Sequence, residues 1–389
     1  MSNKLDYDKI NTQIEKINKE NDLLYLKTLS KKNYNNIIKI TENTIKKTNS
    51  IIKGSRSLYH TLNKSLFTLE EYNYKDYDLY CSVNEEQNFI RILKDSLEKM
   101  NLDNIIKVEP NPVYSNIVII SFYNQKFIDL QLLDKNKMNI IPKMKINNIY
   151  YLSPEFMKLD IYNVISTPIL FNFLSVDKFL KRISHIEKEF KYKQHNKTLY
   201  SLDNNLKIIN NLLNFETKCI ITGLLAYKIL YNNKINVPFL EIFSSNPTKE
   251  MEHIKSKIKI DKIDTGFGLD YSIEHFNILY HNNKPLVYIY KLVDCKSYLN
   301  RNDKLISTNS GLLYYFNNCI YINKYYNELQ NIQIYNIKDI VYTTLLATLY
   351  KKFNKNIITR CIGDMQPVIV RSKNILNMNK KIITTTTNL

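Results

Sequence analysis

The chain has 389 residues, too many for one ordinary domain and a good fit to two or three domains of about 100–200 residues each. Hydrophobic residues make up 44% and charged residues 24%, a globular balance that excludes wholesale disorder. Lys and Arg outnumber Asp and Glu by 55 to 37, so the net charge is +18. Coding bias in a Lys-, Asn-, Ile- and Tyr-rich chain supplies part of this excess, but such a surface attracts polyanions in either case and favours a nucleic-acid partner.

Several classes of protein and site are not expected. No stretch of about 18 apolar residues occurs, so we expect no transmembrane helix and no membrane partner. The polar N-terminus is neither a signal peptide nor a typical transit peptide. The histidines lack zinc-ligand spacing. The five cysteines are widely spaced, and we expect buried free thiols of a reducing compartment at Cys81, Cys219, Cys295, Cys319 and Cys361.

The first 135 residues alternate between helical and strand-like patterns. Apolar residues at helical spacing predict one or two amphipathic helices within residues 3–48, and a further helix is expected over 88–100. Strand-like runs follow from about residue 50, with Asn124-Gln125 as the turn of a hairpin. The expected strands are Tyr77–Val83, Asn116–Phe122 and Lys126–Leu133. This order indicates an α+β fold.

The remaining chain repeats this alternation. Ser153-Pro154-Glu155 is a helix start, which predicts a long helical stretch over 154–192 with a break near Pro168. Strand-like patterns are expected from about 217 to 295, with a turn at Gly266-Phe267-Gly268. A helix over about 338–353 and a basic tail complete the chain.

Two windows of the sequence resemble each other and predict an internal duplication. Residues 117–133 and 276–292 are both strand, polar turn with a Lys, and strand. Upstream of each window lies one of the chain's six glycines, Gly54 in KGSRSLYHTL and Gly223 in ITGLLAYKIL. The alignment sets Lys126 against Lys284, Asp129 against Val287, and Asp76 and Asp78 against Glu241 and Phe243. The first copy therefore keeps three carboxylates and the second at most one.

These patterns divide the chain into five expected parts. They are an N-terminal helical segment (1–50), a catalytic domain (51–150), a helical connector (151–200), a degenerate second copy (201–330), and a C-terminal helix with a basic tail (331–389).

Three acids form the strongest chemical signal of the sequence. Asp76 and Asp78 lie two residues apart on a strand and so point to one face. On the later strand, alternation sets Phe127, Asp129 and Gln131 on one face and the aliphatic residues on the other. A carboxylate on an apolar strand is costly unless it is paired or binds metal, and divalent cations relieve the repulsion among gathered acids.

This arrangement suits two-metal phosphoryl transfer. Asp76 and Asp78 would bridge two Mg²⁺ or Mn²⁺ ions, and Asp129 would share one of them and act on the attacking hydroxyl as ligand or base. Gly54 would let a backbone turn approach nucleotide phosphates without interference from a Cβ. Ser55 and the neighbouring Arg56, at the start of a helix, would contribute to nucleotide binding.

The ordered set of Gly54-Ser55, Asp76-Tyr77-Asp78 and Asp129 resembles the nucleotidyltransferase superfamily that includes DNA polymerase β and the poly(A) polymerases. With the duplication and the basic charge, the chain looks like the poly(A) polymerase catalytic subunits of poxviruses and, more closely, of giant DNA viruses. The segment from Tyr151 to Tyr162 is similar to the helix that follows the third aspartate in that group. The resemblance implies a duplicated nucleotidyltransferase fold, with an active first copy, a degenerate second copy and helical terminal segments.

The same resemblance implies the activity. We expect addition of AMP from ATP to RNA 3′ ends, with two divalent ions at Asp76, Asp78 and Asp129 and the nucleotide at Gly54, Ser55 and Arg56. Single-stranded RNA and ATP are the implied partners, with a homodimer or a viral processivity or capping subunit as a further one, in the host cytoplasm (viral factory) or the virion. The alternatives are another terminal nucleotidyltransferase (CCA- or U-adding, or oligoadenylate synthase) and a non-catalytic RNA-binding or processivity protein.

Overall fold

The chain divides into two compact units, and the boundary between them in the sequence follows Met157. Each unit is described here by itself. The computed structural model describes residues 31–62, 76–111, 116–167, 170–193, 202–215, 218–268, 273–292, 295–353 and 360–363. The first 30 residues and the basic tail therefore lie outside the described residues, as does the part of the N-terminal helical prediction before Lys31. The described part of each unit contains one mixed sheet.

The first unit is built on a seven-stranded sheet. Its strands run in the order β3-β4-β5-β2-β1-β7-β6, with β2 parallel to β5 and β1 parallel to β7. The strands are β1 (Ile51–Lys53), β2 (Tyr77–Ser82), β3 (Ile106–Pro110), β4 (Ile117–Phe122), β5 (Gln125–Leu133), β6 (Lys143–Ile146) and β7 (Ile149–Leu152). The three strands expected from the sequence are confirmed to within one residue at each end.

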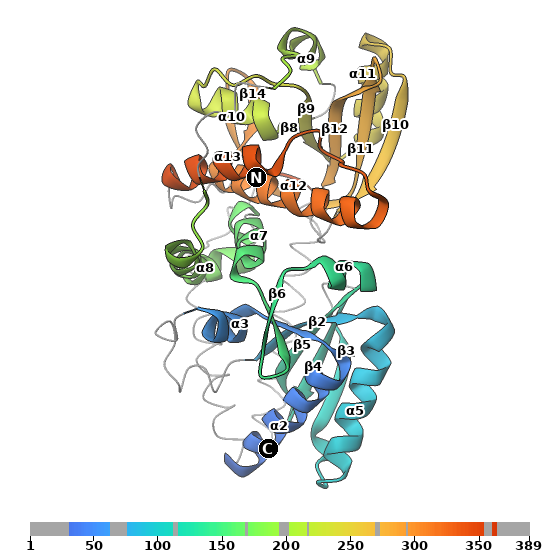
Figure 1. The fold of residues 1–389 in the computed structure, drawn as a ribbon, viewed down its shortest axis with the longest axis vertical. Helices are drawn as coiled ribbons and strands as arrows, with labels where there is room; N and C mark the ends of the chain where they lie inside the picture. The colour runs from blue at the N-terminus through green and yellow to red at the C-terminus, as the bar shows by residue number, and fades with distance from the viewer. Residues whose placement is uncertain are drawn as a thin grey trace, which may run out of the picture. The chain divides into compact units, whose positions relative to one another are not determined.

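Two helices pack against one face of this sheet. Helix α2 (Lys31–Thr48) and helix α5 (Glu86–Glu98) lie side by side on it (Figure 1). Their apolar faces join the apolar residues of the strands in one buried cluster, with Ile37 and Phe89 at 1% and 0% exposure. Since alternate residues of β2 enter this cluster, Asp78 is left on the opposite face. Two short helices, α3 (Gly54–Thr61) and α6 (Lys135–Ile140), flank the strands that carry the acids.

The second unit repeats the same sheet in the same order. Its strands run β10-β11-β12-β9-β8-β14-β13-β15, with β9 parallel to β12 and β8 parallel to β14. The strands are β8 (Ile220–Ile221), β9 (Leu240–Ser244), β10 (Lys262–Phe267), β11 (Ile273–His281), β12 (Lys284–Leu292), β13 (Lys296–Arg301), β14 (Lys304–Ser307) and β15 (Cys361–Ile362). Strands β1 to β7 thus correspond one by one to β8 to β14. The expected duplication and the α+β class are confirmed.

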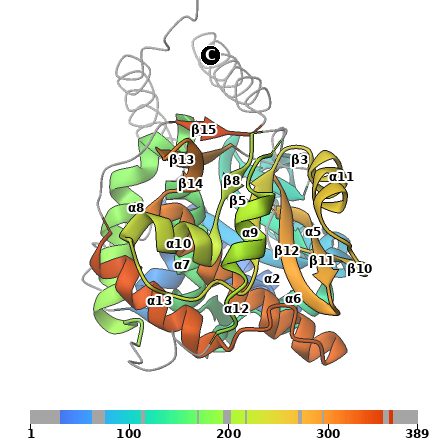
Figure 2. The same cartoon turned by 90° about the horizontal axis from the view of Figure 1, so that it is seen from above.

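The helices of the second unit differ from expectation in three places. Helices α10 (Gly223–Tyr231) and α11 (Pro247–Lys257) interrupt the region expected to be strand-like. Helix α11 lies on the crossover that the parallel pair of β9 and β12 requires. The 22-residue helix α12 (Asn309–Gln330) was not predicted, and it lies beside α13 (Asp339–Lys351), which was (Figures 1 and 2). Thr308 caps α12 by accepting a hydrogen bond from the Gly311 backbone at 3.1 Å.

Two helices follow the seven-stranded sheet of the first unit in the chain, as predicted from the helix start at Ser153-Pro154-Glu155. Helix α7 (Pro154–Ser166) begins at the expected proline, and helix α8 (Leu170–Glu189) follows. Pro168 itself lies outside the described residues. The short helix α9 (Leu206–Leu212) leads into β8. None of the helices in the described part of the chain is long and apolar enough to cross a membrane.

The hairpin between β4 and β5 corrects two expectations. The turn residues are Tyr123 and Asn124, both with positive φ, rather than Asn124-Gln125, because a two-residue turn of this hand matches the strand twist. The register shifts by one residue between Ile120 and Ser121, a β-bulge that inserts Phe127. Phe127 is consequently buried in the core cluster beside Ile128, not on the face of Asp129 as strict alternation predicts.

Gly266 also differs from its predicted place in a turn. It lies within β10, opposite Phe276 of β11. A Cβ built at Gly266 would lie 2.2 Å from Cζ of the Phe276 ring, so the position needs glycine because the neighbouring ring crosses it. This glycine serves packing between strands rather than a change of chain direction.

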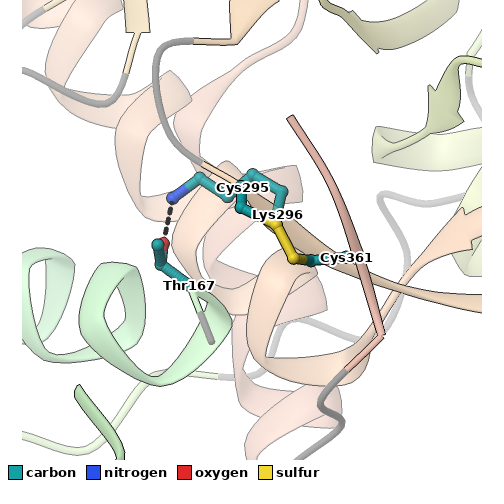
Figure 3. The surroundings of a disulfide bond; sticks show 4 residues. All are labelled: Thr167, Cys295, Lys296 and Cys361. Atoms are coloured by element: carbon teal, nitrogen blue, oxygen red, sulfur yellow. Dashed lines mark hydrogen bonds between the residues drawn. A yellow bond between two sulfur atoms is a disulfide. The ribbon is translucent and has the colours of Figure 1, made fainter. Parts of the chain in front are cut away.

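Two of the five cysteines are not free thiols. Cys295, just before β13, and Cys361, on β15, form a disulfide with Cα atoms 5.5 Å apart (Figure 3). Strand pairing explains the proximity of the two cysteines, which are 66 residues apart in sequence, since Ser297 of β13 pairs with Cys361. A disulfide that closes a loop of this length stabilises the folded state by about 4 kcal/mol, because it lowers the entropy of the unfolded chain. Cys81, Cys219 and Cys319 are buried and take no part in a disulfide, as predicted.

Candidate active site

A glycine turn joins β1 to α3 in the first unit. Gly54 has φ +64°, in the left-handed region that side chains disfavour. A Cβ built there would lie only 2.1 Å from Oδ2 of Asp78. Glycine is therefore needed at this position both for the backbone angle and for the close approach of the turn to the carboxylate.

Strand pairing brings the three predicted acids together. Asp78 on β2 lies opposite Lys53 of β1 on one side and opposite Asp129 of β5 on the other. Asp76 directly precedes β2, two residues from Asp78. Each of the three acids has a carboxylate oxygen within 4.8 Å of the others, and all three are half-buried. This grouping has the donor set and spacing of a divalent metal site.

Asp129 is the least exposed acid of the three. Its side chain is 18% exposed, and its Oδ1 is buried without a hydrogen-bond partner. Burial raises the pKa of Asp129 above the usual range, and the charge of Asp78 raises it further, while Lys126 and Lys53 lower it. An unpartnered, buried carboxylate oxygen beside two further carboxylates is a group that a cation would satisfy, so the residues fit a divalent metal.

Lys126 lies among the acids. Its Nζ forms a close ion pair with Oδ2 of Asp129 and lies 4.0 Å from Oδ2 of Asp76. Burial lowers the pKa of Lys126, but Asp129, Asp76 and Asp78 together raise it by more than burial lowers it. The pKa of Lys126 therefore lies above its usual value. Lys126 is therefore a fully charged ammonium in a cluster of three carboxylates.

From the sequence, Lys126 was expected only to correspond to Lys284 in the second hairpin, with no role at the site. Strict alternation sets residues three apart on opposite strand faces, which hides its relation to Asp129. The bulge at Phe127 removes one step of the alternation, so Lys126 and Asp129 share a face. No signal in the sequence marks the bulge itself.

The residues predicted for nucleotide binding lie at the start of α3. Ser55 and Arg56 are buried, at 5% and 1% exposure, and the Arg56 guanidinium lies 3.7 Å from the ring centroid of Tyr77. Lys53, the residue before the glycine, donates to Oε1 of Gln131 at 2.6 Å and lies 4.6 Å from the Tyr80 ring centroid. The turn, Lys53 and the acids are therefore one connected group, in which binding of nucleotide by Ser55 and Arg56 stays a prediction.

The second unit keeps the glycine turn but loses the acids. Gly223 has φ +63°, and a Cβ there would lie 1.9 Å from Oε2 of Glu241. Glu241 lies opposite Tyr288 in the parallel pair of β9 and β12, where the first unit has Asp78 opposite Asp129. Glu241 thus corresponds to Asp78, not to Asp76, and Tyr288, not Val287, corresponds to Asp129. The prediction that at most one carboxylate remains is confirmed.

Comparison with known proteins supports the resemblance. Residues 36–170 match the family model of the poly(A) polymerase catalytic subunit. The crystal structure of the Megavirus polyadenylate synthase aligns with a TM-score of 0.71 at 16% identity, covering 97% of this chain and 84% of that one. The structure of JHP933 from Helicobacter pylori aligns at a TM-score of 0.24 and 13% identity over 42% of this chain and 77% of that one, too weakly to carry an argument. No curated protein sequence matches the chain.

The two matches cover different parts of the prediction. The family match spans the glycine turn, all three aspartates and Lys126, which is the part of the chain where the chemistry was expected. The structural match extends over both units and bears on the fold. Residues 36–170 are therefore similar in sequence to the poly(A) polymerase catalytic subunit, and the chain as a whole has a fold similar to that of the Megavirus polyadenylate synthase.

Proposed function

We propose that the chain is a polynucleotide adenylyltransferase that transfers AMP from ATP to the 3′ end of RNA. The observation that carries this proposal is the convergence of Asp76, Asp78 and Asp129 beside the turn at Gly54. The match of residues 36–170 to the poly(A) polymerase catalytic subunit supports the choice of reaction.

Asp76, Asp78 and Asp129 would hold two divalent cations, Mg²⁺ or Mn²⁺. When bound, such ions neutralise phosphate charge and lower the pKa of the attacking hydroxyl. The Oδ1 atom of Asp129, buried and without a hydrogen bond, is the ligand atom that most needs such a partner. Asp129 would direct the RNA 3′-hydroxyl towards the α-phosphate, and pyrophosphate would leave in line.

The turn at Gly54 would bind the triphosphate. Its positive φ turns the backbone towards the carboxylates, and the missing side chain lets the turn lie directly against Asp78, next to where the triphosphate would bind. Ser55 would contribute its backbone, and Arg56 would hold the turn through its packing on the Tyr77 ring. In this proposal the chain positions reactants and neutralises charge, because phosphoryl transfer needs little covalent help from protein groups.

The RNA partner is supported by charge. A net charge of +18 favours binding of single-stranded RNA, with an affinity that falls steeply with salt. A second copy of the chain, or a viral processivity or capping subunit, would be the further partner. The reaction would take place in the host cytoplasm, in a viral factory, or in the virion.

The test is primer extension on a labelled single-stranded RNA, with Mg²⁺ and each nucleoside triphosphate in turn. The double variant Asp76→Ala/Asp78→Ala is the control. A ladder with ATP alone that the control lacks supports the proposal. A ladder with CTP or UTP keeps the site and changes the enzyme to a CCA- or U-adding one, and 2′-5′ linkages in the product indicate an oligoadenylate synthase. RNA binding without extension by any nucleotide contradicts the proposal and favours a non-catalytic RNA-binding protein.

A further inference from the structure

We propose that Lys126 is a tethered counter-ion of the aspartate triad, which competes with divalent cations for Asp129 and Asp76 and thereby sets the metal affinity of the enzyme. The inference rests on the proposed function, because it presumes that the triad binds metal. It goes further in naming a residue outside the triad as the determinant of how much metal the enzyme needs.

The contacts of Lys126 are those expected of a cation in a metal position. Its Nζ forms a close ion pair with Oδ2 of Asp129 and lies 4.0 Å from Oδ2 of Asp76. The three acids hold oxygens within 4.8 Å of one another, so a single charge at this place neutralises part of the repulsion among them. A divalent cation bound by the same oxygens would meet this ammonium at close range.

Lys126 can leave the triad without unfolding its surroundings. Its side chain is 46% exposed, whereas that of Asp129 is 18% exposed, so the ammonium has water on one side and the carboxylate does not. The residue lies next to the β4–β5 turn, at the start of β5. The long side chain of a lysine at such a place reaches solvent by rotating about its own bonds.

The other cation near the triad is differently placed. Lys53 donates to Oε1 of Gln131 and lies over the Tyr80 ring, and its charge acts on Asp129 from further away. Among the residues that the structure describes, Lys126 is the cation for which an ion pair with members of the triad is found. It is therefore the group whose removal most changes the charge that a metal meets.

The second unit lacks both partners of this interaction. The register shift between Leu279 and Tyr280 repeats the bulge of the first unit, so Pro285 takes the place of Lys126 and Tyr288 that of Asp129. Where the acids are absent, no cation stands at this position. The bulge alone therefore does not require a lysine, and Lys126 belongs with the acids.

The charge argument fixes the direction of the effect. Replacing Lys126 by an uncharged residue removes the competitor and also a repulsive charge near the bound metal, so the dissociation constant for metal should fall. At the same separation, a divalent ion is repelled by the ammonium twice as strongly as a monovalent ion is. We expect binding about tenfold tighter.

The experiment measures Mn²⁺ binding to the full chain without nucleotide, by electron paramagnetic resonance of free Mn²⁺ at constant ionic strength. The variants are Lys126→Met, Lys126→Gln and the charge-retaining Lys126→Arg. The matched control is Lys107→Met, which removes an exposed lysine paired with Glu109 on the same sheet. Asp78→Asn identifies the Mn²⁺ that is bound at the triad.

The expected result is a dissociation constant about tenfold lower for Lys126→Met and Lys126→Gln, with Lys126→Arg and Lys107→Met close to the parent chain. Equal or weaker binding in both uncharged variants, with a triad site that Asp78→Asn removes, overturns the inference and leaves the proposed function standing. If no Mn²⁺ binding depends on Asp78, the proposed function fails and the inference fails with it. Two uncharged replacements are used so that a folding defect in one does not decide the outcome.

Discussion

Each of the two units has its own sheet with the same strand order and its own glycine turn, but the residues next to the turn differ in charge and burial. In the first unit, three half-buried acids lie beside the turn at Gly54. In the second unit, Phe239, Glu241, Tyr288 and Tyr290 are buried, and Pro285 is half-buried. From the strand register, Asp76, Asp78, Lys126, Asp129 and Gln131 correspond to Phe239, Glu241, Pro285, Tyr288 and Tyr290.

The carboxylate that remains in the second unit is neutralised by its own surroundings. Glu241 accepts hydrogen bonds from the Leu224 backbone at 2.8 Å and from the Tyr315 hydroxyl at 3.0 Å. Tyr290 continues this chain of hydroxyl contacts, 2.8 Å from Tyr315 and 2.6 Å from Tyr335. Burial raises the pKa of Glu241 to about 8, although both hydrogen bonds lower it.

The comparison separates what the fold needs from what the chemistry needs. Both units keep the glycine with positive φ and a carboxylate against it, so this pair belongs to the fold. The second and third carboxylates and the lysine occur in the first unit alone, so the fold does not require them, and the proposed chemistry gives them a role. In the second unit, Phe239 and Tyr288 replace two of the acids and pack with ring centroids 4.8 Å apart.

The largest expected effect tests this separation directly. Asp78→Asn should lower the rate of AMP addition by about 10³-fold or more, because a carboxylate that would hold both ions loses its charge. Glu241→Gln, the equivalent change in the second unit, should leave the rate within about twofold. Primer extension with ATP under saturating RNA measures both. Equal losses in the two variants would mean that the second unit also takes part in the chemistry.

Substitution of the two glycines by alanine should have different effects: Gly54→Ala should mainly lower activity, and Gly223→Ala should mainly lower stability. In Gly54→Ala, the half-buried Asp78 can turn away from the new Cβ, so we expect loss of activity by about 10²-fold with a modest loss of stability of about 1–2 kcal/mol. In Gly223→Ala, Glu241 is buried and bonded on both oxygens and cannot move, so about 3–5 kcal/mol of stability should be lost. Urea unfolding and primer extension measure the two effects, and a larger loss of stability for Gly54→Ala would contradict the comparison.

Much of the site could be predicted from sequence because it depends on local rules. Asp76 and Asp78 share a strand face through simple alternation, and the glycine before a helix marks the turn. Asp129 joins them because β5 lies parallel to β2, and the family resemblance had implied that the three acids form one group. The similarity of the two hairpin sequences also predicted the duplication correctly. Both hairpins have a two-residue turn with positive φ, at Tyr123-Asn124 and at Asn282-Asn283.

The features that sequence could not supply depend on tertiary contacts. The alignment of the two copies was displaced by one residue at Val287 and by two at Glu241, because the connections between equivalent strands differ in length. The bulge that brings Lys126 to Asp129 has no composition of its own. The pairing of Cys295 with Cys361 depends on strand β15, which is two residues long.

The buried carboxyl of the second unit should make stability depend on pH. With its pKa raised from 4.5 to about 8, Glu241 keeps in the folded state a proton that it loses in the unfolded chain above pH 4.5. Its contribution to stability is complete below pH 4.5 and is lost as the pH rises through about 8. In Glu241→Gln this loss should vanish, a difference on the order of 3 kcal/mol between pH 5 and 8.5.

Urea unfolding of the parent chain and of Glu241→Gln at the two pH values measures this difference. The control is Glu109→Gln, which changes an exposed glutamate paired with Lys107 in the first unit and should leave the parent pH dependence intact. If the parent chain and Glu241→Gln lose the same free energy of unfolding between pH 5 and 8.5, then Glu241 is ionised throughout and the second unit holds a charge after all.

The smallest expected effect concerns the chain of hydroxyl contacts that leads from Glu241 through Tyr315 and Tyr290 to Tyr335. Tyr290→Phe removes the hydroxyl between Tyr315 and Tyr335, so two buried partners lose a hydrogen bond, at a cost of about 1–2 kcal/mol. Tyr288→Phe removes a single bond, to the Ile334 carbonyl at 2.8 Å, and should cost about 1 kcal/mol or less. Urea unfolding of both variants measures which one loses more free energy of unfolding. If Tyr290→Phe costs no more than Tyr288→Phe, the hydroxyls do not act as a connected chain, and the second unit is held by its aromatic packing alone.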